Sequence, residues 1–150
     1  MKRRQKKLTL ALTALVLTLF PGGSHGSGPQ VNGEITRMMI QSYDLLEAGK
    51  ADEARKIYQQ VLQKDPGNPL ALNNLGAVMV KKGNYKEALA SLEQALVRAK
   101  GYKVMVNKVC EVKGICLAFR PLGEVYGNQE LEPLIRLNIR MVKTKLTVIE

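Results

Sequence analysis

The sequence is poor in the residues that most often perform catalysis. It has one histidine, His25, and two cysteines, and aromatic residues make up only 5% of its 150 residues. Histidine is the commonest general base, so its scarcity argues against acid–base catalysis. The chain has no Gly-rich phosphate loop, no paired-histidine motif and no serine nucleophile motif. Two cysteines alone do not complete a zinc site. We therefore expect a protein that is not an enzyme and has no cofactor and no metal.

The net charge of +10 is unevenly distributed along the chain. Five basic residues and no acidic ones lie in residues 1–26, whereas residues 31–97 contain eight basic and eight acidic residues. Residues 98–150 contain ten basic and five acidic residues. The neutral middle and the few aromatic side chains available for base stacking argue against a nucleic-acid partner.

The first 26 residues have the pattern of an export signal. Five basic residues precede the apolar run Leu8–Phe20, and the small residues Ser24 and Gly26 follow it. As a helix, the run would span about 20 Å, less than the roughly 30 Å of a membrane's hydrocarbon core. We predict a signal peptide at residues 1–26 and export to the periplasm. The alternative is an inner-membrane anchor at residues 8–20.

A fixed period organises the middle of the chain. Gly49 and Ala54 recur 34 residues later as Gly83 and Ala88. A period of this length indicates stacked helix–turn–helix units. After a linker at residues 27–34, apolar residues at three- and four-residue steps predict four antiparallel helices.

These residues resemble the tetratricopeptide repeat. The second unit carries Leu72-Asn73-Asn74-Leu75-Gly76, Gly83-Asn84-Tyr85, Glu87-Ala88 and Ala95-Leu96, and the first unit matches at Tyr43, Gly49, Glu53, Ala54, Tyr58 and Pro66. The chain departs from the family pattern at Gln41 and Ser42, where Leu and Gly are usual, and at Lys100, where Pro is usual. The resemblance implies two repeats over residues 35–100, the first at residues 35–68 and the second at residues 69–101. By analogy with the family, it also implies protein binding.

The family also implies a binding surface, because the first helix of each repeat lines the concave side. The resemblance thus assigns a protein or peptide partner to Met39, Tyr43, Leu46, Asn73, Asn74, Ala77, Val80 and Lys81. Asparagines there can bond to a partner's backbone, while Tyr and Met give adaptable apolar contacts. Met39 and Leu46 fit the hydrophobic core equally well. The family subgroup that binds a free C-terminus needs Lys and Arg beside its Asn, and only Asn74 matches.

Residues 129–150 predict an amphipathic helix that caps the stack. Its apolar residues share one broad face, and Arg136, Arg140 and Lys143 fall on the opposite face. This basic face either points only at water or contacts an anionic partner or lipid headgroups.

Residues 102–128 fit a small β-hairpin near residues 104–118, an irregular disulfide loop or a degenerate third repeat. Cys110 and Cys116 lie six residues apart, which would place them about 240° apart on a helix. In a hairpin with a three-residue loop at residues 112–114, the two cysteines would face each other. An oxidising compartment then predicts a disulfide between them. Their spacing differs from the C-x-x-C of redox enzymes.

The expected fold class is all-α, an antiparallel helix-hairpin stack with a C-terminal cap helix and a small β-hairpin. The expected function is that of an exported, non-catalytic protein-interaction module or assembly scaffold. One alternative is a membrane-associated or anionic-partner adaptor acting through the basic C-terminal helix. A second alternative is a thiol-redox accessory protein.

Overall fold

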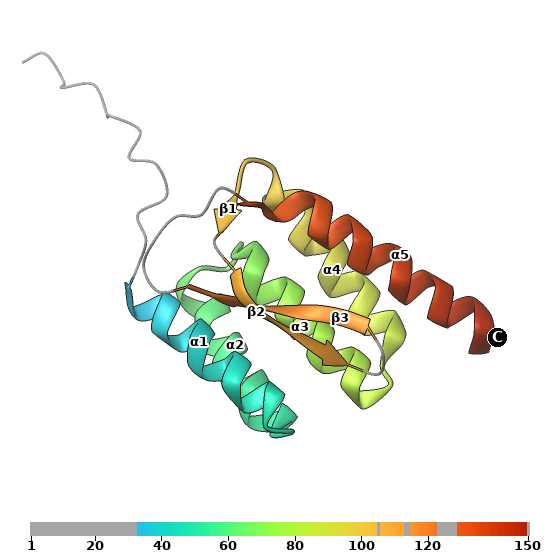
Figure 1. Ribbon diagram of the computed structural model, residues 1–150, viewed down its shortest axis with the longest axis horizontal. Coiled ribbons are helices and arrows are strands. Elements are labelled where there is room, and N and C mark those ends of the chain that lie inside the picture. Colours follow the sequence, from blue (N-terminus) through green and yellow to red (C-terminus); the bar gives the residue numbers. More distant parts are fainter. Residues whose placement is uncertain (1–32, 105, 113–114, 123–128, 150) are drawn as a thin grey trace, which may run out of the picture.

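The computed structural model describes residues 33–104, 106–112, 115–122 and 129–149 (Figure 1). The four helices of the repeat region are α1 (Gly33–Glu47), α2 (Ala51–Lys64), α3 (Pro69–Lys82) and α4 (Tyr85–Ala99). They are followed by β1 (Lys103–Val104), β2 (Val106–Val112), β3 (Ile115–Pro121), β4 (Gln129–Glu130) and α5 (Leu131–Ile149). The expected all-α stack with a small hairpin is confirmed. The predicted signal and most of the linker lie outside the described residues.

Local signals explain where α1 ends and where α3 begins and ends. Gly49 and Gly83 follow α1 and α3 with φ values of 85° and 86°, a left-handed conformation that glycine adopts without strain. Asn68 caps α3, because its Oδ1 accepts a hydrogen bond of 2.9 Å from the Ala71 N–H, and Pro69 occupies the first helical position. These breaks set the two helical hairpins.

Small residues let the helices of the second hairpin approach each other closely. A Cβ added at Gly76 would lie 3.0 Å from Cγ of Leu92 and 3.3 Å from the backbone oxygen of Ala88. Ala88 and Leu92 are fully buried. Gly76 and Ala88 therefore allow the close packing of α3 on α4.

The two ends of the segment between α4 and α5 lie side by side. β1 pairs with β4 in antiparallel fashion, with Val104 opposite Gln129, and the N–H of Leu131 donates to the Tyr102 oxygen at 3.0 Å. α5 then packs along α4, as Figure 1 shows. The strands β2 and β3 are therefore an excursion from an otherwise continuous helical stack. A degenerate third repeat is not what this segment forms, because β2 and β3 are strands.

The register of the hairpin differs from the one expected. The strands β2 and β3 are antiparallel, but Cys110 lies opposite Ala118, and Cys116 lies opposite Glu111. The pairing leaves two residues between the strands instead of three, and it shifts between Cys110 and Glu111. The expectation that the two cysteines face each other directly was therefore wrong. The disulfide itself stays a prediction.

Among the described helices, none has the length and apolar character needed to cross a membrane.

Candidate functional site

The helices α1 and α3 bring the eight residues assigned to the concave surface together. α1 supplies three of them and α3 supplies five. Seven have at most 1% of their surface exposed, and Lys81 is half-buried. The fully buried set is Met39, Tyr43, Leu46, Asn73, Asn74, Ala77 and Val80. Binding of a partner by these residues stays a prediction, since other parts of the chain already cover them.

The strand β3 covers this surface. It contacts α1, α3 and α5, and in Figure 1 the hairpin lies across α3 between α1 and α5. Leu117, Ala118 and Phe119 are buried at successive positions, with 0%, 0% and 4% of their surface exposed. The concave groove formed by α1, α3 and α5 thus holds an extended segment of the same chain.

Asn74 holds the backbone of β3 at one residue. Its Oδ1 accepts from the Phe119 N–H at 2.9 Å, and its Nδ2 donates to the Phe119 oxygen at 2.8 Å. The same Nδ2 lies 3.3 Å from the hydroxyl oxygen of Tyr58 on α2. A buried side chain that binds both the N–H and the C=O of one residue replaces the partner strand that those groups would otherwise need.

Two further asparagines, Asn73 and Asn138, bind the carbonyl of Leu117, two residues before Phe119 in β3. The Nδ2 of Asn73 donates to the Leu117 oxygen at 2.7 Å, and the Nδ2 of Asn138 on α5 donates to it at 3.1 Å. Asn138 also donates to Oδ1 of Asn73 at 2.8 Å, and Asn73 donates to Oδ1 of Asn74 at 3.1 Å. The three amides form one buried network that binds the edge of β3 at Leu117 and Phe119.

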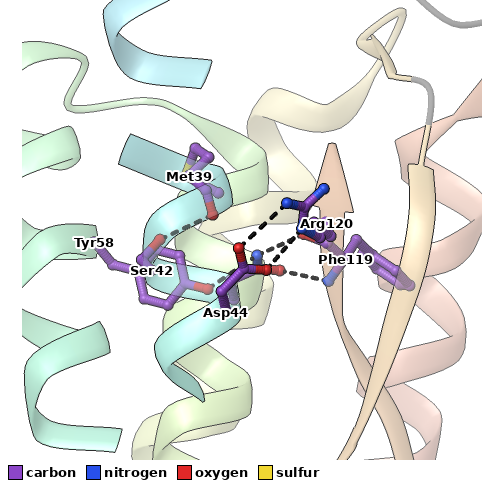
Figure 2. Close-up of polar contacts among 7 residues, drawn as sticks. Met39, Ser42, Asp44, Tyr58, Phe119 and Arg120 are labelled. Carbon is purple, nitrogen blue, oxygen red and sulfur yellow. Dashed lines mark hydrogen bonds and ion pairs between the residues drawn. The ribbon is translucent and has the colours of Figure 1, made fainter. Parts of the chain in front are cut away.

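An ion pair lies at the rim of the groove. Nε of Arg120 donates to Oδ1 of Asp44 at 2.7 Å, and its NH2 group donates to Oδ2 at 3.2 Å. Figure 2 shows the two side chains pointing towards each other from β3 and α1. The hydrogen bond to Asp44, together with the negative charge of that carboxylate, raises the pKa of Arg120. A two-bond contact of this kind fixes geometry as well as charge.

The remaining assigned residues have structural contacts. Nζ of Lys81 donates to the Leu46 oxygen at 3.0 Å, where it satisfies a carbonyl at the end of α1. The hydroxyl of Ser42 donates to the Met39 oxygen, as seen in Figure 2. Met39 and Leu46 belong to the hydrophobic core.

The basic face of α5 is partly neutralised. Arg136 donates to Glu132 on its own helix, with NH2 at 2.8 Å from Oε1, and Lys143 lies 3.6 Å from Oε1 of Glu93 on α4. The structure places Arg136, Arg140 and Lys143 on the exposed side of α5. The backbones of Cys110 and Cys116 lie in β2 and β3. The described residues contain no cluster of His, Cys, Asp and Glu that could hold a metal ion.

Sequence reasoning missed Asp44, Asn138 and Arg120. Asp44 and Arg120 are ordinary charged residues when they are considered separately, and 76 positions of sequence separate them. Asn138 is a single polar residue among the apolar positions of α5, a weak sign of a buried hydrogen bond.

Comparison with known proteins agrees with this geometry. Residues 45–102 match the family described as Tetratricopeptide repeat, which covers the end of α1 and all of α2, α3 and α4. No curated protein and no solved structure matches the chain. Repeats of this family bind proteins and are typically non-catalytic, and they form their surfaces by stacking helical hairpins. Residues 45–102 of this chain therefore have the sequence and the helical hairpins of tetratricopeptide repeats.

Proposed function

We propose that the protein is an exported, non-catalytic interaction module or assembly scaffold that binds an extended segment of another protein in the groove of α1, α3 and α5. The observation that carries the proposal is the contact between Asn74 and both backbone groups of Phe119. Backbone hydrogen bonds supply affinity for any extended chain, and neighbouring pockets supply specificity. The groove therefore has the chemistry needed to hold a strand.

The export part of the proposal rests on residues 1–26. Their basic start, apolar run and small residues support cleavage near Gly26 and a periplasmic location. N-terminal sequencing of the protein from its native host tests this. A product that begins near Ser27 supports export, whereas a cytosolic product that still begins at Met1 contradicts it.

Affinity capture from the native compartment tests the interaction. The full chain is compared with two variants that change the net charge equally, Asp44→Lys at the groove rim and Glu93→Lys on the exposed surface of α4. We expect one partner to be enriched by the full chain and by Glu93→Lys, and to be lost with Asp44→Lys. No enriched partner, or a partner retained equally by all three proteins, contradicts binding in the groove.

A further inference from the structure

The strand β3 is held as a ligand would be held. Besides its pairing with β2, its backbone bonds to side chains of α3 and α5. Leu117, Ala118 and Phe119 are buried, and Arg120 meets a carboxylate of α1. These contacts join residues far apart in sequence, 44 and 45 positions for Leu117 and Phe119. Residues 117–121 therefore show which side chains this groove accepts.

The side chains of residues 117–121 that lie in the groove follow a specific order. Leu117 and Phe119 fill buried positions on either side of the small Ala118, Arg120 pairs with Asp44, and Pro121 is buried next to it. Proline lacks an N–H, so it removes a donor that would otherwise need a partner at the end of the bound segment. A ligand with an acidic residue in place of Arg120 would face Asp44 with like charge.

The hairpin can leave the groove without separating the helices. The chain on either side of it is joined at the β1–β4 pair, where Val104 lies opposite Gln129 and Tyr102 bonds to Leu131. α5 packs directly on α4, in addition to its contacts with β3. Movement of β2 and β3 therefore requires the contacts of β3 to break, while the packing of the stack stays in place.

We propose that the hairpin closes the groove in the free protein, and that the partner is a protein segment with the side-chain order of residues 117–121, which binds by displacing β3. This inference rests on the proposed function and names its ligand. A tethered segment competes at an effective concentration in the millimolar range, so the free protein binds such a segment weakly. A change within β3 that loosens it would raise the affinity for the partner, whereas Asp44→Lys also sets a like charge against the partner's own basic residue.

The test uses the full chain and a charge exchange across the rim. One probe is a fluorescent peptide of residues 115–122 with Cys116→Ser, and the second carries Arg120→Glu in addition. Each is titrated by fluorescence anisotropy into the wild-type chain and into the Asp44→Lys chain. In the Asp44→Lys chain the tethered Arg120 meets a like charge, whereas the second peptide meets an opposite one.

We expect the Arg120→Glu peptide to bind the Asp44→Lys chain about tenfold more tightly than the first peptide binds it. This is the magnitude expected because an exposed ion pair replaces a pair of like charges. Binding of the Arg120→Glu peptide should also accelerate hydrogen exchange of the chain's Phe119 amide, while amides within α3 stay protected. The Glu93→Lys chain is the matched control, and it should behave as wild type.

Three results would overturn the proposal: equal binding of the two peptides to the Asp44→Lys chain, binding that leaves the Phe119 amide protected, or no binding at millimolar peptide. The native capture experiment separates this failure from failure of the proposed function. A partner enriched by the full chain, together with a negative peptide result, leaves the interaction module standing and removes displacement of β3.

Discussion

Replacing Asn74 by alanine should destabilise the protein by an amount that the hydrogen bonds of β3 determine. Asn74 is fully buried and takes part in four side-chain hydrogen bonds, two with Phe119, one with Tyr58 and one with Asn73. Alanine removes all four and leaves the N–H and C=O of Phe119 without their partner.

The magnitude follows from the two backbone groups. A buried polar group that loses its partner costs about 1–3 kcal/mol, so the loss for two groups should lower the free energy of unfolding by about 2–6 kcal/mol. The cost cannot exceed the docking free energy of the hairpin, because β3 can detach and expose the two groups to water. Urea unfolding followed by circular dichroism measures the difference.

Asn68→Ala is the matched control, since it removes the same side chain from the start of the same helix. Asn68 caps α3 through the Ala71 N–H and does not contact β3 through any hydrogen bond among the described residues. Its loss should cost about 1 kcal/mol, the usual value for a helix cap. If Asn74→Ala costs no more than Asn68→Ala, Asn74 does not hold β3 in the groove.

Three further predictions concern other parts of the chain. Ala88→Leu should overpack the fully buried contact between α3 and α4 and lower the free energy of unfolding by about 1–3 kcal/mol, and an unchanged melting temperature would count against this packing. The hydrogen bond that Lys82 donates, and then the positive charge of Lys82, lower the pKa of Asp52. The pair therefore stabilises the fold fully at pH values above the ordinary carboxyl pKa of about 3.9. This stabilisation is lost as the pH falls through the lowered pKa of Asp52. Lys82→Met should raise the pKa of Asp52 in a carbon-13 NMR titration, and an unmoved titration would refute the assignment. Non-reducing peptide mapping of exported protein should find Cys110 and Cys116 in one linked species, whereas free labelling of both thiols would contradict the disulfide.

The helical hairpins could be predicted because their signals are local. Gly49, Pro66 and Gly83 break the chain at a fixed period, and each acts through its own backbone conformation. The family resemblance assigned a binding surface to residues of α1 and α3, among them Asn73 and Asn74. Binding of a partner at that surface stays a prediction.

What fills the groove could not be predicted in the same way. A short apolar segment such as residues 115–121 does not specify which surface it packs against, because periodicity describes only its own faces. The three successive buried residues Leu117, Ala118 and Phe119 break the alternation of a simple strand, next to the register shift of the hairpin. Long-range contacts, such as Asp44 with Arg120, appear only when the chain is folded.

Hydrogen exchange at the Phe119 amide of the full chain tests the central claim most directly. Because this N–H bonds to Asn74 in the buried groove, it should exchange far more slowly than an exposed amide and should lose that protection in Asn74→Ala. Exchange in the wild-type chain as fast as in an unstructured peptide would contradict the claim that the protein fills its own groove.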